Sequence, residues 1–196
     1  MKTARRIHLV PITLLALATF GCATAPSKFY TLESTAGADR DATASYAILV
    51  APVTIPASVD RPELVVQDAP NRVWLDEFNR WAGPLADGIA TTVAGDLVKL
   101  LGTPRVTASP LANFDPDYRV SIEVQRFDST PGESVLVDAV WVVRKSAGGA
   151  SRSGRTVASE PVQGKDYAAI PAAHSRALAR LSGDLAAAIR SLATRG

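Results

Sequence analysis

Two neighbouring stretches of the chain, residues 117–128 and 133–145, carry the alternation of side chains that is typical of β-strands. In DYRVSIEVQRFD the apolar residues Val120, Ile122 and Val124 alternate with polar ones. In ESVLVDAVWVVRK both alternating sets are largely apolar, as in a central strand that is covered on both faces. A Thr-Pro-Gly turn between them predicts an antiparallel hairpin. A chain with such a pair must build a sheet and cover it.

Two amphipathic helices are predicted to supply that cover. Pro84 opens the first, at a position where the missing N–H of proline costs nothing, and Gly102 ends it. The second runs over about residues 172–194. Each carries apolar side chains on one face at helical spacing, which are Leu85, Ile89, Val93, Leu97 and Leu101 in the first and Leu178, Leu181, Leu185, Ile189 and Leu192 in the second. Because both helices are one-sided, each needs a sheet to pack on.

Shorter β-prone runs complete the predicted sheet. They are found at residues 29–32, 45–55, 63–67, 72–75 and 155–162. Small and polar residues at 34–43 predict a loop after the first of them. The predicted fold class is α/β, with a mixed, largely antiparallel sheet covered by two main helices in a three-layer arrangement.

The start of the chain resembles the signal of a bacterial lipoprotein. Three basic residues and no acid lie in the first six positions, and residues 7–20 are mostly apolar but short and broken by proline. The run ends at Gly21, directly before Cys22, as in the lipobox, where the cysteine thiol receives a diacylglycerol, the peptide is cut before it and the new amine is acylated. Thr19 stands where leucine is preferred, so an ordinary secreted protein and an uncleaved anchor stay as alternatives.

This interpretation divides the chain into a signal peptide at 1–21, a lipidated tether at 22–28 and a single α/β domain at 29–196. Ala23 follows the cysteine. An aspartate there would hold such a lipoprotein at the inner membrane, so alanine predicts the periplasmic face of the outer membrane. The covalent lipid on Cys22 is the only attached group expected, and no cofactor is predicted.

Removing the signal changes the charge of the chain. The whole sequence has 21 Lys and Arg against 19 Asp and Glu, and three of the basic residues lie in the signal, which leaves 18 against 19. The mature chain therefore has no basic excess with which to bind nucleic acid. Since lipid occupies the only cysteine, neither a disulfide nor thiol catalysis is expected.

The search for reactive groups predicts no enzyme and no metal site. Residues 149–156 have the glycine spacing of a phosphate-binding loop, but a strand-like run follows them where a helix should begin, which favours a solvated hairpin loop. His174 is the only histidine left after cleavage, and no second histidine, cysteine or acidic cluster accompanies it. A hydrolase built around His174 stays as the catalytic alternative.

Two proline-rich stretches stand out without being reactive. Residues 50–66 combine prolines with an Asp-Arg pair, and residues 80–85 place Trp81 just ahead of a helix. One interpretation is structural, with prolines ending a strand and Trp81 packing on the helix start. The other is a protein-binding rim, because Trp, Arg and exposed prolines suit interfaces. The candidate partner-binding residues are Tyr30, Pro56, Asp60, Arg61, Pro62, Trp81 and Pro84.

The motifs FYTL, VTIP followed by DRPELV, RWAGPL and the final helix AAHSRALARLSGDLAAAI resemble the PqiC/YmbA family, auxiliary lipoproteins of ABC-type lipid transport. Residues 57–59 depart from the family, many members of which carry a bulkier residue there. The resemblance implies a non-catalytic protein with a fold similar to the amino-terminal domain of TolB. It also implies a PqiB-like MCE-domain partner, a role in envelope integrity and ring-like self-association. An assembly factor for another envelope export system is the main alternative.

Overall fold

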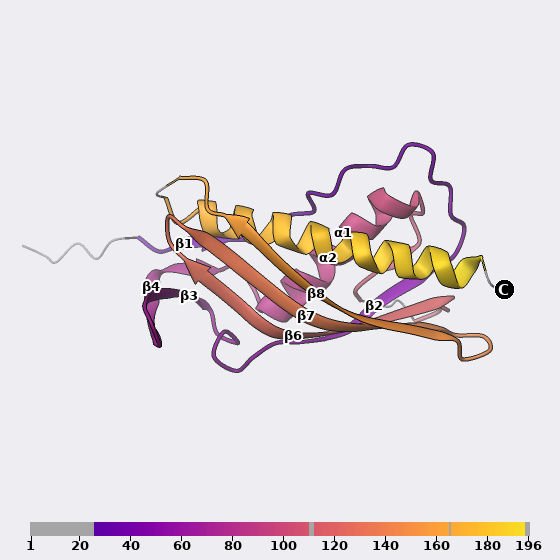
Figure 1. The fold of residues 1–196 in the computed structure, drawn as a ribbon, viewed down its shortest axis with the longest axis horizontal. Helices are drawn as coiled ribbons and strands as arrows, with labels where there is room; N and C mark the ends of the chain where they lie inside the picture. Colours follow the sequence, from indigo (N-terminus) through magenta and orange to yellow (C-terminus); the bar gives the residue numbers. More distant parts are fainter. Residues whose placement is uncertain (1–25, 110–111, 165, 195–196) are drawn as a thin grey trace, which may run out of the picture.

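The computed structural model describes residues 26–109, 112–164 and 166–194, whose strands form two sheets (Figure 1). The larger sheet has the strand order β5-β2-β6-β7-β8, and the smaller has the order β1-β4-β3. The elements in chain order are β1 (Lys28–Tyr30), β2 (Ile48–Thr54), β3 (Glu63–Ala69), β4 (Arg72–Trp81), α1 (Leu85–Leu101), β5 (Val106–Thr107), β6 (Tyr118–Thr130), β7 (Ser134–Lys145), β8 (Ser151–Pro161) and α2 (Ala169–Ala193). Among these residues, neither helix has the length and apolarity that a membrane span requires.

The strands β6 and β7 form the predicted antiparallel hairpin, in register from Tyr118 opposite Lys145 to Thr130 opposite Ser134. β8 continues the sheet antiparallel to β7, and β2 lies parallel to β6 on the other side. α1 and α2 pack against each other and against this sheet (Figure 1). Every residue of the two predicted apolar stripes is buried. The predicted fold class, a mixed, largely antiparallel sheet with two main helices, is confirmed.

β7 is well covered on only one of its faces, so the prediction of a strand sandwiched on both faces is wrong. Val140 on the outer face is 37% exposed. On the same face Arg155 donates two hydrogen bonds to Asp138, at 2.8 and 2.6 Å, and these hydrogen bonds lower the pKa of the Asp138 carboxyl. The helix α2 packs on the inner face of β7, where the alternate residues of the strand are buried. The apolar outer positions therefore face solvent beside an ion pair.

The glycine-rich stretch at 149–156 is only partly the predicted loop, because β8 already begins at Ser151. Gly154 lies within β8 directly against the indole of Trp141, and an added Cβ there would overlap the ring. The indole N–H donates to the hydroxyl of Thr156 at 3.1 Å. The second glycine of this spacing is thus explained by the buried Trp141 ring, and the first, Gly149, by a turn in which its φ is 67°.

The smaller sheet gives β4 its unexpected length. The sequence predicted a strand that ends at Leu75, but β4 continues to Trp81 because its last three residues pair in parallel with β1. Before that pairing begins, the carboxylate of Asp76 accepts hydrogen bonds from the backbone amides of Phe78 and Asn79, both at 2.9 Å. These bonds hold extra residues in a bulge opposite β3.

Residues 31–44, called the N-terminal strap below, cross the two helices without regular structure (Figure 1). Asp96 of α1 is completely buried and accepts hydrogen bonds from the hydroxyl of Ser34 at 2.8 Å and the amide of Ala36 at 2.9 Å. At the end of α1, Gly102 has a φ of 64°, and an added Cβ there would overlap the carbonyl oxygen of Ala42. The predicted loop is therefore a fixed part of the fold.

Candidate functional site

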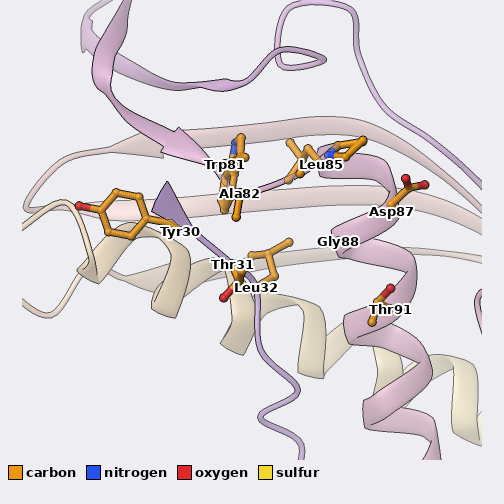
Figure 2. A pocket seen from close by; sticks show the side chains of 11 residues that line it. Tyr30, Thr31, Leu32, Trp81, Ala82, Leu85, Asp87, Gly88 and Thr91 are labelled. Atoms are coloured by element: carbon orange, nitrogen blue, oxygen red, sulfur yellow. The ribbon is translucent and has the colours of Figure 1, made fainter. Parts of the chain in front are cut away.

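The ends of β1 and β4 and the start of α1 border an open pocket of about 320 Å³, called the β1–α1 pocket below (Figure 2). Its lining includes Tyr30, Leu32, Trp81, Gly83, Pro84 and Leu85. Figure 2 shows these side chains coming from three separate segments, with Asp87 and Thr91 of α1 on one side. The pocket thus joins sequence motifs that lie about fifty residues apart.

Backbone pairing holds the walls of the pocket in place. Tyr30 lies opposite Trp81 in the parallel register, and its carbonyl accepts a 2.8 Å hydrogen bond from the amide of Ala82. The amide of Trp81 donates to the carbonyl of Pro62 at 2.7 Å. Pro84 then turns the chain into α1 with a φ of −55°, and no side chain caps the helix. The RWAGPL motif is therefore the junction between a strand and a helix.

The Tyr30 hydroxyl is a hydrogen-bond donor within this junction. It donates to the side-chain oxygen of Asn79 at 2.7 Å. Burial raises the pKa of the Tyr30 phenol, and the nearby carboxylates of Asp166 and Asp76 raise it further. The phenol therefore stays protonated near neutral pH and cannot act there as a base.

Trp81 belongs mainly to the core. It is 7% exposed, and its ring meets Phe127 edge to face with centroids 6.3 Å apart. This burial agrees with the structural interpretation, in which Trp81 packs on the start of the helix. A partner in the β1–α1 pocket would meet only the small part of the indole that lines it.

The structure brings together three of the seven candidate partner-binding residues, Tyr30, Trp81 and Pro84. Pro62 is tied to them only through its carbonyl, and the other candidates do not line the pocket. Those others are Pro56, Asp60 and Arg61. They form a turn in which the amide of Asp60 donates to the carbonyl of Pro56 at 3.2 Å.

Sequence reasoning missed other residues of the pocket, above all Leu32 and Gly83. Leu85 was predicted as a core residue, and it both lies in the core and lines the pocket. Gly83 lies within the RWAGPL motif, but its place at the pocket follows from the meeting of β4 with α1 and not from a property of the residue itself. Leu32 could have been found from the FYTL motif, had its side chain been assigned to the same surface as Tyr30.

The lining of the β1–α1 pocket is mostly apolar and suits an apolar side chain of a partner better than a reaction. Within residues 26–109, 112–164 and 166–194, no three His, Cys, Asp or Glu side chains gather closely enough to hold a metal ion. Asp87 is the one carboxylate among the pocket residues. What the arrangement offers is an open, hydrophobic recess with a hydrogen-bonded rim.

The closest approach to a catalytic pair lies elsewhere, between Ser129 of β6 and His174 of α2. The Ser129 hydroxyl is 2.8 Å from Nε2 of His174, whose ring stacks on Phe127 with centroids 3.7 Å apart. His174 is completely buried, and among the described residues its Nδ1 has no hydrogen-bond partner. A serine hydrolase would need an acid at that nitrogen to orient the ring. The pair therefore fits core packing better than catalysis.

Burial makes His174 a source of acid sensitivity. It lowers the pKa of His174 from the usual 6.5 to about 3. Between these values the unfolded chain binds a proton that the folded protein excludes, so acid favours unfolding. We expect His174 to contribute a loss of about 1.4 kcal/mol in the free energy of unfolding for each pH unit below about 6.5, ending near pH 3.

Urea unfolding at a series of pH values checks this expectation. The variant His174→Gln cannot take up the proton, so its stability should fall less steeply between pH 6 and pH 4, by about 1.4 kcal/mol per unit. Carboxylates contribute equally to both proteins and cancel in the comparison. Parallel slopes for the two proteins would show that His174 is not held neutral by burial.

The predicted lipidation site, Cys22, lies outside the described residues. The family described as "ABC-type transport auxiliary lipoprotein component" matches residues 30–186 of the chain. That range contains the β1–α1 pocket and nearly all of the described fold. Among curated proteins, none matches the chain.

Two solved structures have a similar fold. One, described only as an uncharacterized protein, is 19% identical with a TM-score of 0.67, and the match covers 84% of this chain and 99% of that one. The other, a protein of Xanthomonas campestris assigned to family DUF330, is also 19% identical with a TM-score of 0.67, over 86% of this chain and 99% of that one. At this identity the likeness shows the fold alone.

Proposed function

The chain belongs to the family of ABC-type transport auxiliary lipoprotein components, and on that basis we propose that it docks an MCE-type protein as part of an intermembrane lipid transport system. In this proposal the domain stands on the periplasmic face of the outer membrane. It receives the far end of a PqiB-like partner that is anchored in the inner membrane. Loss of the docking would weaken the envelope.

The proposed anchor is a lipid on Cys22. The charged start, the apolar run and the Gly-Cys pair support lipidation there, and Ala23 in place of aspartate supports the outer membrane. Only residues 23–27 separate the cysteine from β1. A segment of that length reaches on the order of 20 Å when extended, which keeps the domain close to the bilayer.

The observation that carries the docking role is the β1–α1 pocket. It is apolar and open, and it is built from the FYTL and RWAGPL motifs on which the family resemblance rests. An auxiliary component acts by contact with other parts of its transporter, and a hydrophobic recess with a polar rim is the kind of surface that receives an anchoring side chain. The proposed contact is an apolar side chain of the MCE protein seated between Tyr30 and Leu85.

The substitution Gly83→Phe tests this contact. A Cβ added at Gly83 meets no atom within 4 Å, so a larger residue can be placed at this position of the pocket lining without overlapping the backbone, and phenylalanine is chosen to obstruct the pocket. We expect the variant to recover at least about tenfold less MCE protein when a tagged form is purified from crosslinked cells, a loss of about 1.4 kcal/mol or more. Its own stability should change by no more than about 0.5 kcal/mol.

Gly37→Phe is the matched control. It adds the same ring to the exposed N-terminal strap, at a position that does not line the pocket and where an added Cβ also meets no atom within 4 Å. This variant should recover the partner normally. If both variants recover the same amount of MCE protein, the pocket is not the docking site. If the unchanged chain recovers no MCE protein, the proposed docking function itself is contradicted.

The family resemblance also supports ring-like self-association, which belongs to the same proposal. Mass measurement of the purified protein in solution tests it directly, since a ring has a mass several times the 20.6 kDa of one chain. Recovery of components of a different export system in place of an MCE protein would favour the alternative role as an assembly factor.

A further inference from the structure

Large apolar side chains are exposed at one place more than anywhere else in the described part of the chain. Five of the seven that are exposed lie on β1 and β4, and they are Phe29, Val73, Trp74, Leu75 and Phe78. Phe29 is 62% exposed, and Val73 and Trp74 are each 59% exposed. Trp74 lies on one side of β4 and Val73 and Leu75 on the other, because successive residues of a strand point to opposite sides, so this surface runs around the unpaired edge of β4. We call these five residues the β1–β4 apolar face. Such a cluster marks a surface that is meant to be covered.

The β1–β4 apolar face lies at the end of the molecule where the described chain begins. In Figure 1 the labels β1, β3 and β4 stand together at that end, and the carboxyl end of the chain lies at the opposite end. Phe29 is only seven positions after Cys22, and the segment between them reaches on the order of 20 Å. A lipid on Cys22 would therefore hold this face beside the bilayer.

The strands that carry and border the face have no basic excess, since Lys28, Arg72 and Arg80 stand against four acidic residues, Glu63, Asp68, Asp76 and Glu77. Arg72 pairs with Asp68 at 2.9 Å, and Arg80 pairs with Glu63 at 3.2 Å, all on the β3–β4 hairpin. No basic excess is left there to bind anionic headgroups. Attraction of this face to a bilayer would therefore come from burial of apolar surface and would be insensitive to salt.

The backbone of β4 limits how deeply the β1–β4 apolar face can enter a bilayer. β1 pairs only with the last three residues of β4, so the edge of β4 before Asn79 has no strand beside it. Free backbone groups cannot enter the hydrocarbon, but they find partners among headgroups and water. Tryptophan and tyrosine are enriched at that same depth, where Trp74 would lie. The composition and the open edge both fit the interface between headgroups and acyl chains.

We propose that the β1–β4 apolar face rests in the interfacial layer of the bilayer that the Cys22 lipid enters, with Trp74 among the acyl chains. The inference rests on the lipid anchor of the proposed function. It fixes the orientation of the domain on the membrane and leaves the β1–α1 pocket, whose entrance involves other side chains, for the partner.

Tryptophan fluorescence can test this placement, because Trp74 is exposed while the other two tryptophans, Trp81 and Trp141, are 7% and 8% exposed. The chain from Cys22 onward keeps every described element, and its single cysteine can be coupled to maleimide lipid, which supplies an anchor whether or not cells attach one. The vesicles contain phosphatidylethanolamine and phosphatidylglycerol, part of them with brominated acyl chains. We expect bromine to remove the Trp74 emission, with no loss in Trp74→Phe and no recovery at high salt.

The matched control moves the reporter to the open face of the large sheet. Val157 is 61% exposed on β8, so Val157→Trp in the Trp74→Phe background should stay bright. If Trp74 of the lipid-coupled protein is not quenched, the inference is wrong, and a protein partner becomes the better candidate to cover this surface. That result would not contradict the proposed lipid anchor on Cys22. Equal quenching at both positions, or quenching lost at high salt, would overturn it too. Whether cells lipidate Cys22 is decided separately.

Discussion

Replacing Cys22 with serine is expected to release the protein from the membrane. Serine cannot receive the diacylglycerol through a thioether, so the proposed lipid anchor is lost together with the cut that follows it. The uncut apolar run at 7–20 is too short and too broken by proline to replace that anchor. With the acyl chains gone, the amount of protein that sediments with membranes should fall at least about tenfold. Fractionation of cells, with detection of the tagged chain in soluble and membrane fractions, measures the effect.

A second substitution separates anchoring from sorting. Ala23→Asp keeps the cysteine and should keep the protein in the membrane fraction, but the rule for such lipoproteins places it at the inner membrane. Density separation of the two membranes distinguishes the outcomes. If Cys22→Ser leaves both attachment and the mass of the mature chain unchanged, the lipoprotein interpretation of residues 1–22 is wrong.

Asp96→Ala is expected to cause the largest loss of stability of any exchange considered, about 4 kcal/mol. The carboxylate is completely buried and accepts from Ser34, from the amide of Ala36 and, at 3.1 Å, from the hydroxyl of Ser182. Alanine leaves the Ser34 hydroxyl and the Ala36 amide without this acceptor, whereas the Ser182 hydroxyl keeps the carbonyl of Leu178 at 2.9 Å. Each buried donor left unpaired costs about 1–3 kcal/mol. The N-terminal strap would then lose two of its hydrogen bonds to α1, while its bonds to Lys99 of α1 and Ser175 of α2 remain.

The free energy of urea unfolding measures this loss, and two milder variants calibrate it. Asp96→Asn keeps one acceptor oxygen and should cost about half as much, while Ser34→Ala removes a single bond and should cost about 1 kcal/mol. The expected loss of stability is therefore largest for Asp96→Ala, smaller for Asp96→Asn and smallest for Ser34→Ala. If Asp96→Ala were no more damaging than Ser34→Ala, the strap would not depend on this carboxylate.

The elements with strong periodicity could be predicted from the sequence, because their patterns reflect one buried face. α1 was predicted almost to the residue, since Pro84 and Gly102 mark its ends chemically. The β6–β7 hairpin followed from alternation and a turn. The residues on both faces of β7 are apolar, so the sequence pattern could not show which face other elements cover. Val140 proved to be exposed.

Features that depend on contacts distant in sequence were not predictable. The second sheet includes β1 because this strand pairs with the end of β4, about fifty residues later. No pattern in the residues of β1 itself predicts that pairing. Gly154 is required by an indole thirteen residues earlier. The buried Asp96 lies on the predicted helix among apolar residues, and its purpose appears only once the strap crosses it.

The candidate site was predictable in part for the same reason. Tyr30, Trp81 and Pro84 come from the motifs that carry the family resemblance, and the fold gathers them around one pocket. The turn that holds Asp60 and Arg61 has no place in that pocket, so its residues remain predicted contacts without a shared surface. Of the family motifs, FYTL and RWAGPL therefore meet at this pocket, whereas VTIP and DRPELV do not line it.

The most direct test of the docking role is a photoreactive amino acid placed at residue 83 in living cells, with the crosslinked product identified by mass spectrometry. Position 83 lines the β1–α1 pocket, and position 37 on the N-terminal strap is the matched control. The account predicts a product with an MCE-domain protein from position 83 and none from position 37. Products with that protein from both positions alike, or from position 37 alone, would contradict it.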